Sequence, residues 1–284
     1  MNKGEIEMKV YKEADVRKGV QTKLKENPNS FYREALLNYK GKTVDSDTLL
    51  TEVIADELIK NYDQVSKIGR NTPIRKTKSF NREHVGVATV KARIQRFGYL
   101  GYNEKLLAIA LYNSKQSYCL GDIFDYEVPI KEVQTDKHGR VDLVSTDALN
   151  HSVKLIELKI KPPNDNNDET LLRALLEIYT YYKLISDSYG KFLEDYKLST
   201  KEYQRFQPAI LTDKHALSGQ ALLNLKKHPR LQALISKMNN EIGCTIEGFV
   251  YDYPSKIKLF QSNGEDKQKI MLQGNIEITK IIYT

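Results

Sequence analysis

The sequence predicts an α/β fold, in which a mixed central β-sheet flanked by helices is joined to a mainly helical N-terminal region. Helical periodicity dominates up to about residue 115. Short runs of β-type residues begin near residue 122, and a strongly helical segment follows the third of them. We therefore expect a mainly helical region over residues 1–115 and an α/β domain over residues 116–284.

Composition sets broad limits on the class of protein. The chain has 284 residues, 40% of them hydrophobic, which is enough to bury a full core. A formal charge of +7 suits a polyanionic partner without identifying one. The two cysteines, Cys119 and Cys244, lack the spacing of a zinc cluster or a disulfide framework. The polar N-terminal sequence and the absence of any run of about 18 apolar residues predict a cytoplasmic protein without a membrane partner, and leave homo-oligomers open.

In the N-terminal region, apolar residues recur with helical spacing over 49–59, after the cap candidates Asp45 and Ser46. The stretch 67–96 is the most basic part of the chain, because its lysines and arginines face only one acid, Glu83. A phosphate-contacting surface would explain this charge, with Arg75, Lys76 and Lys78 as candidate nucleic-acid-binding residues. A solvated loop and helix face would explain it equally well.

The second part of the chain begins with three strand candidates, 124–130, 140–145 and 153–160, separated by turn-like segments. We expect them to form a meander. A polar loop follows, and then a helix over 169–185 for which Asp168 is the predicted N-cap. The remaining candidates are strands at 208–212, 245–251, 256–260 and 276–283 and one helix at 219–238.

Charged residues interrupt two of these hydrophobic strands. Alternation places Asp142 on the opposite face of its strand from Val141 and Leu143. Glu157 and Lys159 are two residues apart and therefore share one face of the next strand. A short connection favours an antiparallel hairpin, which would bring the two carboxylates and the ammonium group together.

Two neighbouring carboxylates raise each other's pKa unless a cation lies between them, and hard oxygen ligands favour Mg²⁺ or Mn²⁺. Such an ion could polarise a phosphoryl oxygen while Lys159 orients the attacking water and offsets negative charge. This set of groups suits phosphodiester hydrolysis. The spacing alone also fits a solvated face carrying Glu157 and Lys159, with Asp142 accepting hydrogen bonds from a turn.

The order EVPI, GRVDLV, LIELK and then a helix with a polar-xxx-Tyr pattern resembles the PD-(D/E)XK nuclease superfamily, over residues 122–185. The resemblance implies a restriction-endonuclease-like core, with Asp142, Glu157 and the Leu158 carbonyl as metal ligands and Lys159 as the catalytic lysine. Glu127 matches an acid beside the metal site in the RecB-like branch, although an exposed edge-strand carboxylate would look the same.

On the following helix, Arg173, Glu177 and Tyr181 recur every four residues and share one stripe. The stripe resembles the Gln-xxx-Tyr motif of the RecB-like branch, which makes these residues nucleic-acid-binding candidates. Glu177 replaces the usual Gln, and a carboxylate cannot donate a hydrogen bond unless it is protonated, although a pairing with Arg173 would place a donor beside it. An ordinary surface ion pair beside a packed tyrosine is the alternative.

The leading hypothesis is therefore a metal-dependent nuclease, endo- or exonucleolytic, that acts on DNA in preference to RNA. The preference for DNA follows from the resemblance alone. A second hypothesis is a non-catalytic nucleic-acid-binding or assembly module that retains the fold. A third is a metal-independent scaffold whose carboxylates are ordinary surface residues.

Overall fold

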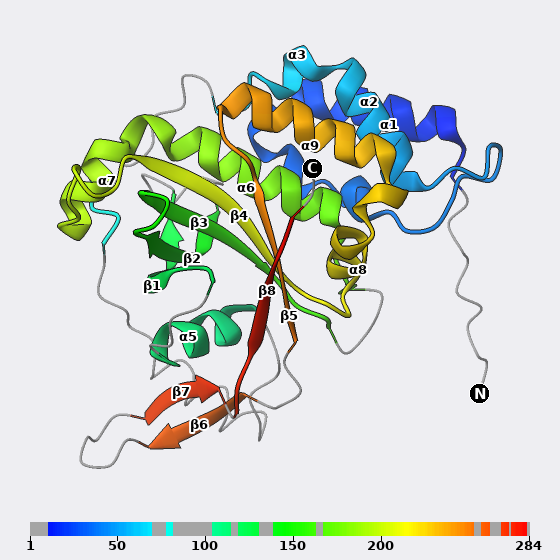
Figure 1. The fold of residues 1–284 in the computed structure, drawn as a ribbon. Coiled ribbons are helices and arrows are strands. Elements are labelled where there is room, and N and C mark those ends of the chain that lie inside the picture. The colour runs from blue at the N-terminus through cyan, green and yellow to red at the C-terminus, as the bar shows by residue number, and fades with distance from the viewer. Residues whose placement is uncertain are drawn as a thin grey trace.

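The computed structural model shows a mixed six-stranded β-sheet at the centre of the chain, in the order β1-β2-β3-β4-β5-β8 (Figure 1). The structure describes residues 11–69, 78–81, 104–114, 119–130, 139–162, 167–252, 257–261, 268–272 and 274–282. The strands are β1 (Asp122–Pro129), β2 (Arg140–Asp147), β3 (Ser152–Lys159), β4 (Arg205–Asp213), β5 (Glu247–Asp252) and β8 (Glu277–Ile281).

The predicted meander is present. β1, β2 and β3 pair antiparallel, β4 and β5 then run parallel to β3, and β8 pairs antiparallel with β5 at the far edge. In the hairpin of β2 and β3, Leu143 lies opposite Ile156. The pairing ends at this point, and the next residue of β2, Asp142, accepts the N–H of Leu158 through its side chain. The prediction that Val141 and Leu143 share a face is wrong, because the two side chains lie in different hydrophobic cores.

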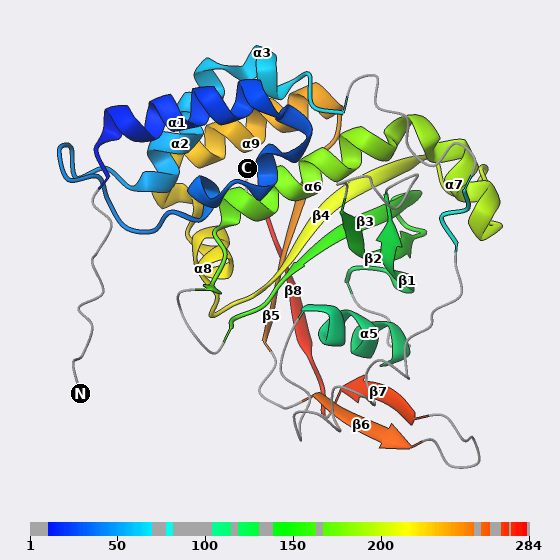
Figure 2. The same ribbon diagram turned by 180° about the vertical axis from the view of Figure 1, so that it is seen from behind.

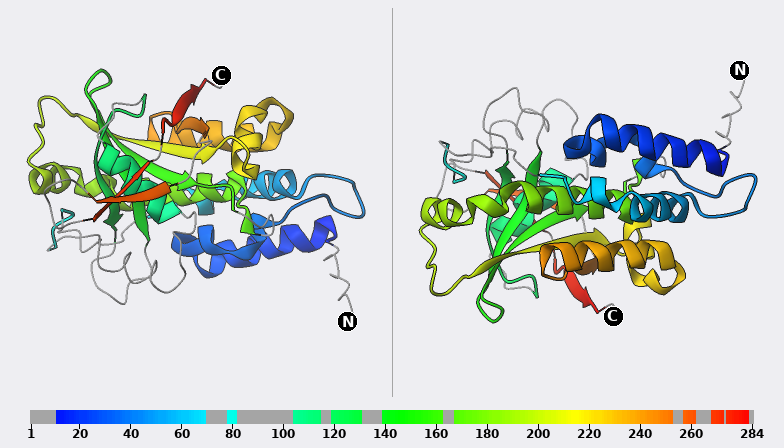
Figure 3. Two further views of the ribbon diagram at one scale, coloured as in Figure 1. Left: turned by 90° about the horizontal axis from the view of Figure 1, so that it is seen from below. Right: turned by 90° about the horizontal axis from the view of Figure 1, so that it is seen from above.

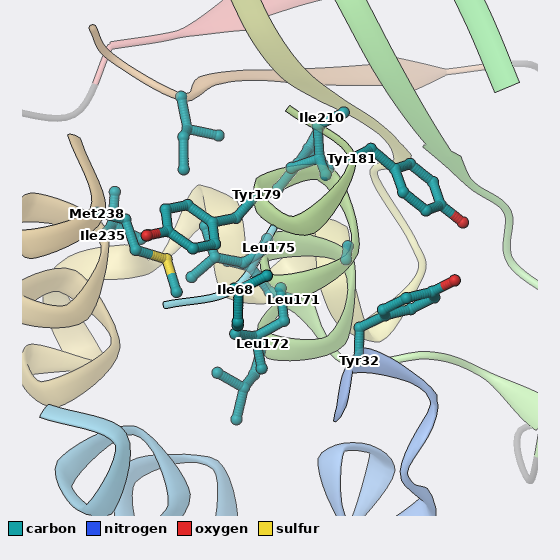
Figure 4. Packing of buried hydrophobic residues seen from close by; sticks show 14 of the residues in the cluster. Tyr32, Ile68, Leu171, Leu172, Leu175, Tyr179, Tyr181, Ile210, Ile235 and Met238 are labelled. Atoms are coloured by element: carbon teal, nitrogen blue, oxygen red, sulfur yellow. The ribbon is translucent and has the colours of Figure 1, made fainter. Parts of the chain in front are cut away.

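One face of the sheet is covered by a layer of helices: α1 (Glu13–Glu26), α2 (Leu50–Lys60), α6 (Leu171–Ile185) and α9 (Pro229–Ile242). Seen from above, α1 and α9 flank α2 and α6 (Figure 3). Figure 4 shows Tyr179 of α6 beside Ile235 and Met238 of α9, all of them buried. The predicted helix over 169–185 is thus the buried centre of this layer, between the sheet and the outer helices.

The opposite face carries α5 (Glu104–Ser114) and a separate hairpin of β6 (Ile257–Gln261) and β7 (Gln268–Leu272) (Figure 2). Leu107 and Leu111 of α5 belong to a second, smaller hydrophobic core, which also contains Ile156 and Leu158 of β3. β3 is therefore buried on both faces along its whole length, although Ser152, Lys154, Glu157 and Lys159 are polar or charged.

Shorter elements connect these layers: the helices α3 (Tyr62–Val65), α7 (Tyr189–Tyr196) and α8 (Leu217–Leu223), and the 3₁₀ turns η1 (Pro28–Arg33), η2 (Ala35–Asn38), η4 (Ser186–Ser188) and η5 (Leu225–Lys227). Across the described segments, no helix combines the length and apolar character needed to span a bilayer.

Two of the predicted helix caps are wrong. α6 is capped by Thr170, whose hydroxyl accepts the Arg173 N–H at 3.2 Å. Asp168 instead accepts hydrogen bonds from Lys161 Nζ and from the N–H of Leu217, both at 3.0 Å, so that it serves the start of α8.

The second error concerns α2, which begins at Leu50 without a side-chain cap. Asp45 accepts the N–H of Glu13, at the start of α1, and Ser46 donates to the Glu13 carboxylate. Their polar side chains therefore join a loop to another helix. Capping partners from a distant part of the chain leave no local pattern in the sequence.

The helix predicted over 219–238 is also wrong, because two helices occupy this stretch. α8 ends at Leu223, the turn η5 intervenes, and α9 starts with Pro229 at its first position. The buried carboxylate of Glu52, on α2, accepts the N–H groups of Arg230 at 2.8 Å and of Leu231 at 3.2 Å. This contact fixes α2 to the N-terminus of α9.

We expect Glu52→Ala to lower the free energy of unfolding by about 1–2 kcal/mol, because two N–H groups at the positive end of α9 lose their acceptor. Urea unfolding followed by circular dichroism measures the change. Glu26→Ala is the control, since Glu26 is an exposed helix residue bonded to an exposed lysine. The control should stay within about 0.5 kcal/mol of the native chain, and equal losses in both variants would contradict the capping role.

Candidate active site

The centre of the candidate site is the end of β3. Val153, Leu155, Glu157 and Lys159 occupy alternate positions and share the face that meets α6. The side chains of Val153 and Leu155 join the larger hydrophobic core. The charged pair is buried as well, since Glu157 is 3% exposed and Lys159 is 4% exposed. Ionised groups buried to this degree are costly unless they are paired, so their partners define the site.

Asp142 projects from β2 beside this pair. One of its carboxylate oxygens, Oδ2, accepts the N–H of Leu158 at 2.8 Å. Because the N–H and C=O of one residue point to the same side of a strand, the Leu158 carbonyl is directed toward Asp142 as well. The structure thus brings together the side chains of Asp142, Glu157 and Lys159 and the backbone of Leu158.

Four carboxylates surround the ammonium group of Lys159. The distance from Nζ to the nearest carboxylate oxygen is 2.7 Å for Glu157, 2.8 Å for Glu169, 3.2 Å for Glu177 and 3.8 Å for Glu104. Glu104 starts α5 and Glu169 lies just before α6, and neither was predicted as a site residue. No spacing in the sequence links them to β3, and only the packing of α5 and α6 brings them there.

The site carries an excess of negative charge. Five carboxylates gather here, those of Asp142 and of the four glutamates around Lys159. Among the described residues, Arg173 is the only cation other than Lys159 that forms an ion pair with them. Its Nε lies 2.9 Å from Glu169, although not in hydrogen-bonding geometry. The proposed pairing of Arg173 with Glu177 is therefore wrong. Glu177 instead contacts Lys159 and accepts the Tyr181 hydroxyl at 2.8 Å.

The pKa shifts follow from burial and from this charge. Burial raises the pKa of Asp142 and of Glu157 well above the usual carboxyl range, and repulsion from Asp142 adds to the rise at Glu157. Burial acts against the charge of Lys159, but Glu157 and Glu177 hold its pKa well above the ordinary value. The lysine is therefore a permanent cation beside two acids, Asp142 and Glu157, that resist ionisation. Burial acts against the charge of Glu177 as well, but Lys159 and the Tyr181 hydroxyl hold its pKa below the usual value.

Tyr181 is held by an unusually close approach of the chain. A Cβ atom on Gly139, just before β2, would lie 1.9 Å from the Tyr181 hydroxyl oxygen and 2.6 Å from Cζ. Only glycine fits this position without moving the ring. The Tyr181 hydroxyl, buried and bonded to Glu177, has a raised pKa, mainly because of burial.

The other predicted site residues are Glu127 and three basic residues of the N-terminal region. Glu127, on β1, has a left-handed backbone with φ of 52° and binds Arg140 at 2.8 Å. Lys78 is exposed in the short segment around Phe80. Arg75 and Lys76 lie outside the residues that the structure describes.

The donor set fits a divalent cation in one respect. Glu157 Oε2 is buried and has no hydrogen-bond partner, whereas Oε1 is taken by Lys159. A cation next to Oε2 and Asp142 would neutralise both acids. Within the described ranges, no group of three or more His, Cys, Asp or Glu side chains is arranged to hold a metal ion. Two carboxylates and one backbone carbonyl form a smaller set than such a group.

Comparisons with models of protein families, with curated proteins and with solved structures found no match to this chain.

We expect Gly139→Ala to lower the free energy of unfolding by about 1–3 kcal/mol, because the added methyl group overlaps the Tyr181 ring. Gly190→Ala is a matched control, since a Cβ at Gly190 in α7 meets nothing within 4 Å and alanine favours a helix. Urea denaturation of both variants measures the difference. A neutral Gly139→Ala would show that Tyr181 does not occupy the described position.

Proposed function

We propose that this chain is a metal-dependent nuclease of the PD-(D/E)XK type, with a restriction-endonuclease-like core, that hydrolyses phosphodiester bonds in DNA. The proposal depends chiefly on one observation. Asp142, Glu157 and Lys159 converge from adjacent strands in a buried cluster in which one glutamate oxygen has no partner. A buried acid pair beside a permanent cation is costly for stability alone, and functional sites commonly carry such perturbed groups.

The chain order supports the same proposal. The segments on which the resemblance depends are β1, β2, β3 and α6, which follow one another in the sequence and meet in space. Glu177, from the helix motif, contacts Lys159 and accepts the hydroxyl of Tyr181, so that both motif residues join the same cluster. The preference for DNA over RNA comes from the resemblance alone.

Asp142, Glu157 and the Leu158 carbonyl would hold Mg²⁺ or Mn²⁺, which when bound supplies a Lewis acid for the phosphoryl group and lowers the pKa of a bound water. Lys159 would stabilise the negative charge that develops on the phosphoryl oxygens. Glu169 and Glu177 keep the Lys159 ammonium in place and charged. Burial between β3 and α6 excludes water, which strengthens these interactions.

A second candidate function is a non-catalytic nucleic-acid-binding or assembly module with this fold. One observation favours it. Lys159 Nζ lies 2.7 Å from Glu157 Oε1, so that part of the carboxylate needed for the metal is already neutralised by the lysine. In this case the protein would bind nucleic acid and leave it intact.

The purified protein, incubated with linear, circular and single-stranded DNA, should cut in Mg²⁺ or Mn²⁺ and not in EDTA. Asp142→Asn should abolish the cutting, because it removes a metal ligand while keeping the size of the side chain. Gel analysis of the products also separates cutting from ends and cutting within the strand. Salt-sensitive binding without cutting under any of these conditions would favour the second candidate.

Lysine substitutions on β3 test the role of Lys159. Lys159→Met should lower the cleavage rate by about 10²-fold or more, since a charge stabiliser of the transition state is lost. Lys154→Met is the matched control, because Lys154 is a buried lysine on the same strand that pairs with Asp147 and Glu247 instead. The rates are compared well below both melting temperatures. Lys154→Met should lose stability and keep its rate, so an equal loss of rate in both variants would argue against a catalytic Lys159.

Binding of the metal is measured separately by titrating the protein with Mn²⁺ in a calorimeter, without nucleic acid. We expect Glu157→Gln to weaken Mn²⁺ binding by at least about tenfold, because a neutral amide is a poorer ligand than a carboxylate. Glu202→Gln, on an exposed loop, should leave it unchanged. Equal affinity in the native chain and Glu157→Gln would remove Glu157 from the metal site.

A further inference from the structure

An arginine from the N-terminal region lies at the edge of this site. Arg33 ends the turn η1, its side chain is exposed, and its Nε donates to the hydroxyl of Tyr32 at 2.8 Å. Its guanidinium carbon also lies 5.2 Å from the centre of the Tyr32 ring. Neither contact is a hydrogen bond of a terminal nitrogen, and no described residue accepts a hydrogen bond from these two nitrogens, so that they remain available for a ligand.

Tyr32 connects Arg33 to the candidate active site. Tyr32 is 2% exposed, and its ring meets the ring of Tyr181 edge to face, with the centroids 5.5 Å apart. Figure 4 shows the hydroxyl groups of the two rings directed to the same side, away from the packed leucines of α6. The Tyr181 hydroxyl binds Glu177, whose other oxygen lies 3.2 Å from Lys159.

Arg33 differs in its partners from basic residues on β2, after β3 and on α6. Arg140 binds Glu127, Lys161 binds Asp168 and Arg173 lies against Glu169, so the charge of each is already offset. In the described part of the chain, no carboxylate comes within ion-pair distance of Arg33. It is an uncompensated cation at the rim of a cluster that is otherwise acidic.

A nucleic-acid strand that enters an acidic site needs nearby cations for its phosphates. Arginine suits this purpose because its planar donors match two phosphate oxygens at once. We propose that Arg33 binds a backbone phosphate that flanks the scissile bond, and that Tyr32 positions its guanidinium. The inference deepens the proposed nuclease function and rests on it for the nature of the ligand.

The test compares Arg33→Ala with the native chain in two measurements. Fluorescence anisotropy with a labelled oligonucleotide, in EDTA and at a series of salt concentrations, gives affinity without cleavage. We expect about a tenfold loss of affinity and a salt slope reduced by about one, the signature of a lost phosphate contact. In Mg²⁺, the KM for cleavage should rise while kcat changes by less than about twofold, since the contact is made to substrate and transition state alike.

Two further variants make the test specific. Arg205→Ala removes another exposed arginine at the opposite end of the sheet, because Arg205 pairs in register with Ser152 and Lys159 pairs with Thr212. It should bind like the native chain. Tyr32→Phe keeps the ring and removes the hydroxyl that holds Arg33, and should lose part of the affinity.

Native affinity and salt slope in Arg33→Ala would overturn the proposal, and so would an equal loss in Arg205→Ala, which would indicate a nonspecific charge effect. Thermal melting of each variant shows whether it is folded. If Arg33→Ala is not folded, Arg33→Lys is tested in its place, and a loss of affinity relative to the native chain is again expected. Failure of the native chain to cut DNA would refute the proposed nuclease function. It would not refute the contact of Arg33 with a phosphate, which the binding measurement still tests. Failure of the native chain to bind any oligonucleotide would refute the Arg33 contact, and cleavage in Mg²⁺ judges the nuclease separately.

Discussion

The buried ion cluster around Lys159 is the constraint on which the rest of the structure depends. Its carboxylates come from β3, from α6, from the segment before α6 and from the start of α5, so one ammonium group joins elements on both faces of the sheet. Removing a partner from a buried ion pair leaves an uncompensated charge, at a cost of about 3–5 kcal/mol. The same group that would serve catalysis therefore also holds the layers in register.

The N-terminal region takes part in this arrangement through α6. The Thr170 hydroxyl, which caps α6, also donates to the Leu37 carbonyl, and its N–H donates to Asn38. Tyr32 packs against Tyr181 one turn after Glu177. Segments more than 130 residues apart in sequence thus fix the helix that carries Glu177 and Tyr181. The rigidity of α6, rather than any loop, determines where these two side chains lie.

Sequence patterns predicted the parts of the molecule that are governed by local periodicity. Alternation on β3 was enough to place Glu157 and Lys159 on one face, because the side-chain period of a strand is fixed. It was not enough on β2, where Val141 and Leu143 lie in different hydrophobic cores. It could not find Glu104 and Glu169, which reach Lys159 only through packing of separate helices. The helix caps failed for the same reason: Asp168 and Asp45 find partners in distant elements.

The contact of Glu52 with the first turn of α9 bears on how the chain is made. The two partners are 178 residues apart, and a ribosome adds about 5–20 residues per second, so α2 emerges roughly 10–35 seconds before the N–H groups that its carboxylate accepts. During this interval Glu52 and the apolar face of α2 lack their native cover. The helices α1 and α2 can pair early through the native contacts of Arg17 with Asp56 and Glu57, whereas the part of α2 that meets α9 gains its native partner only after α9 has been synthesised.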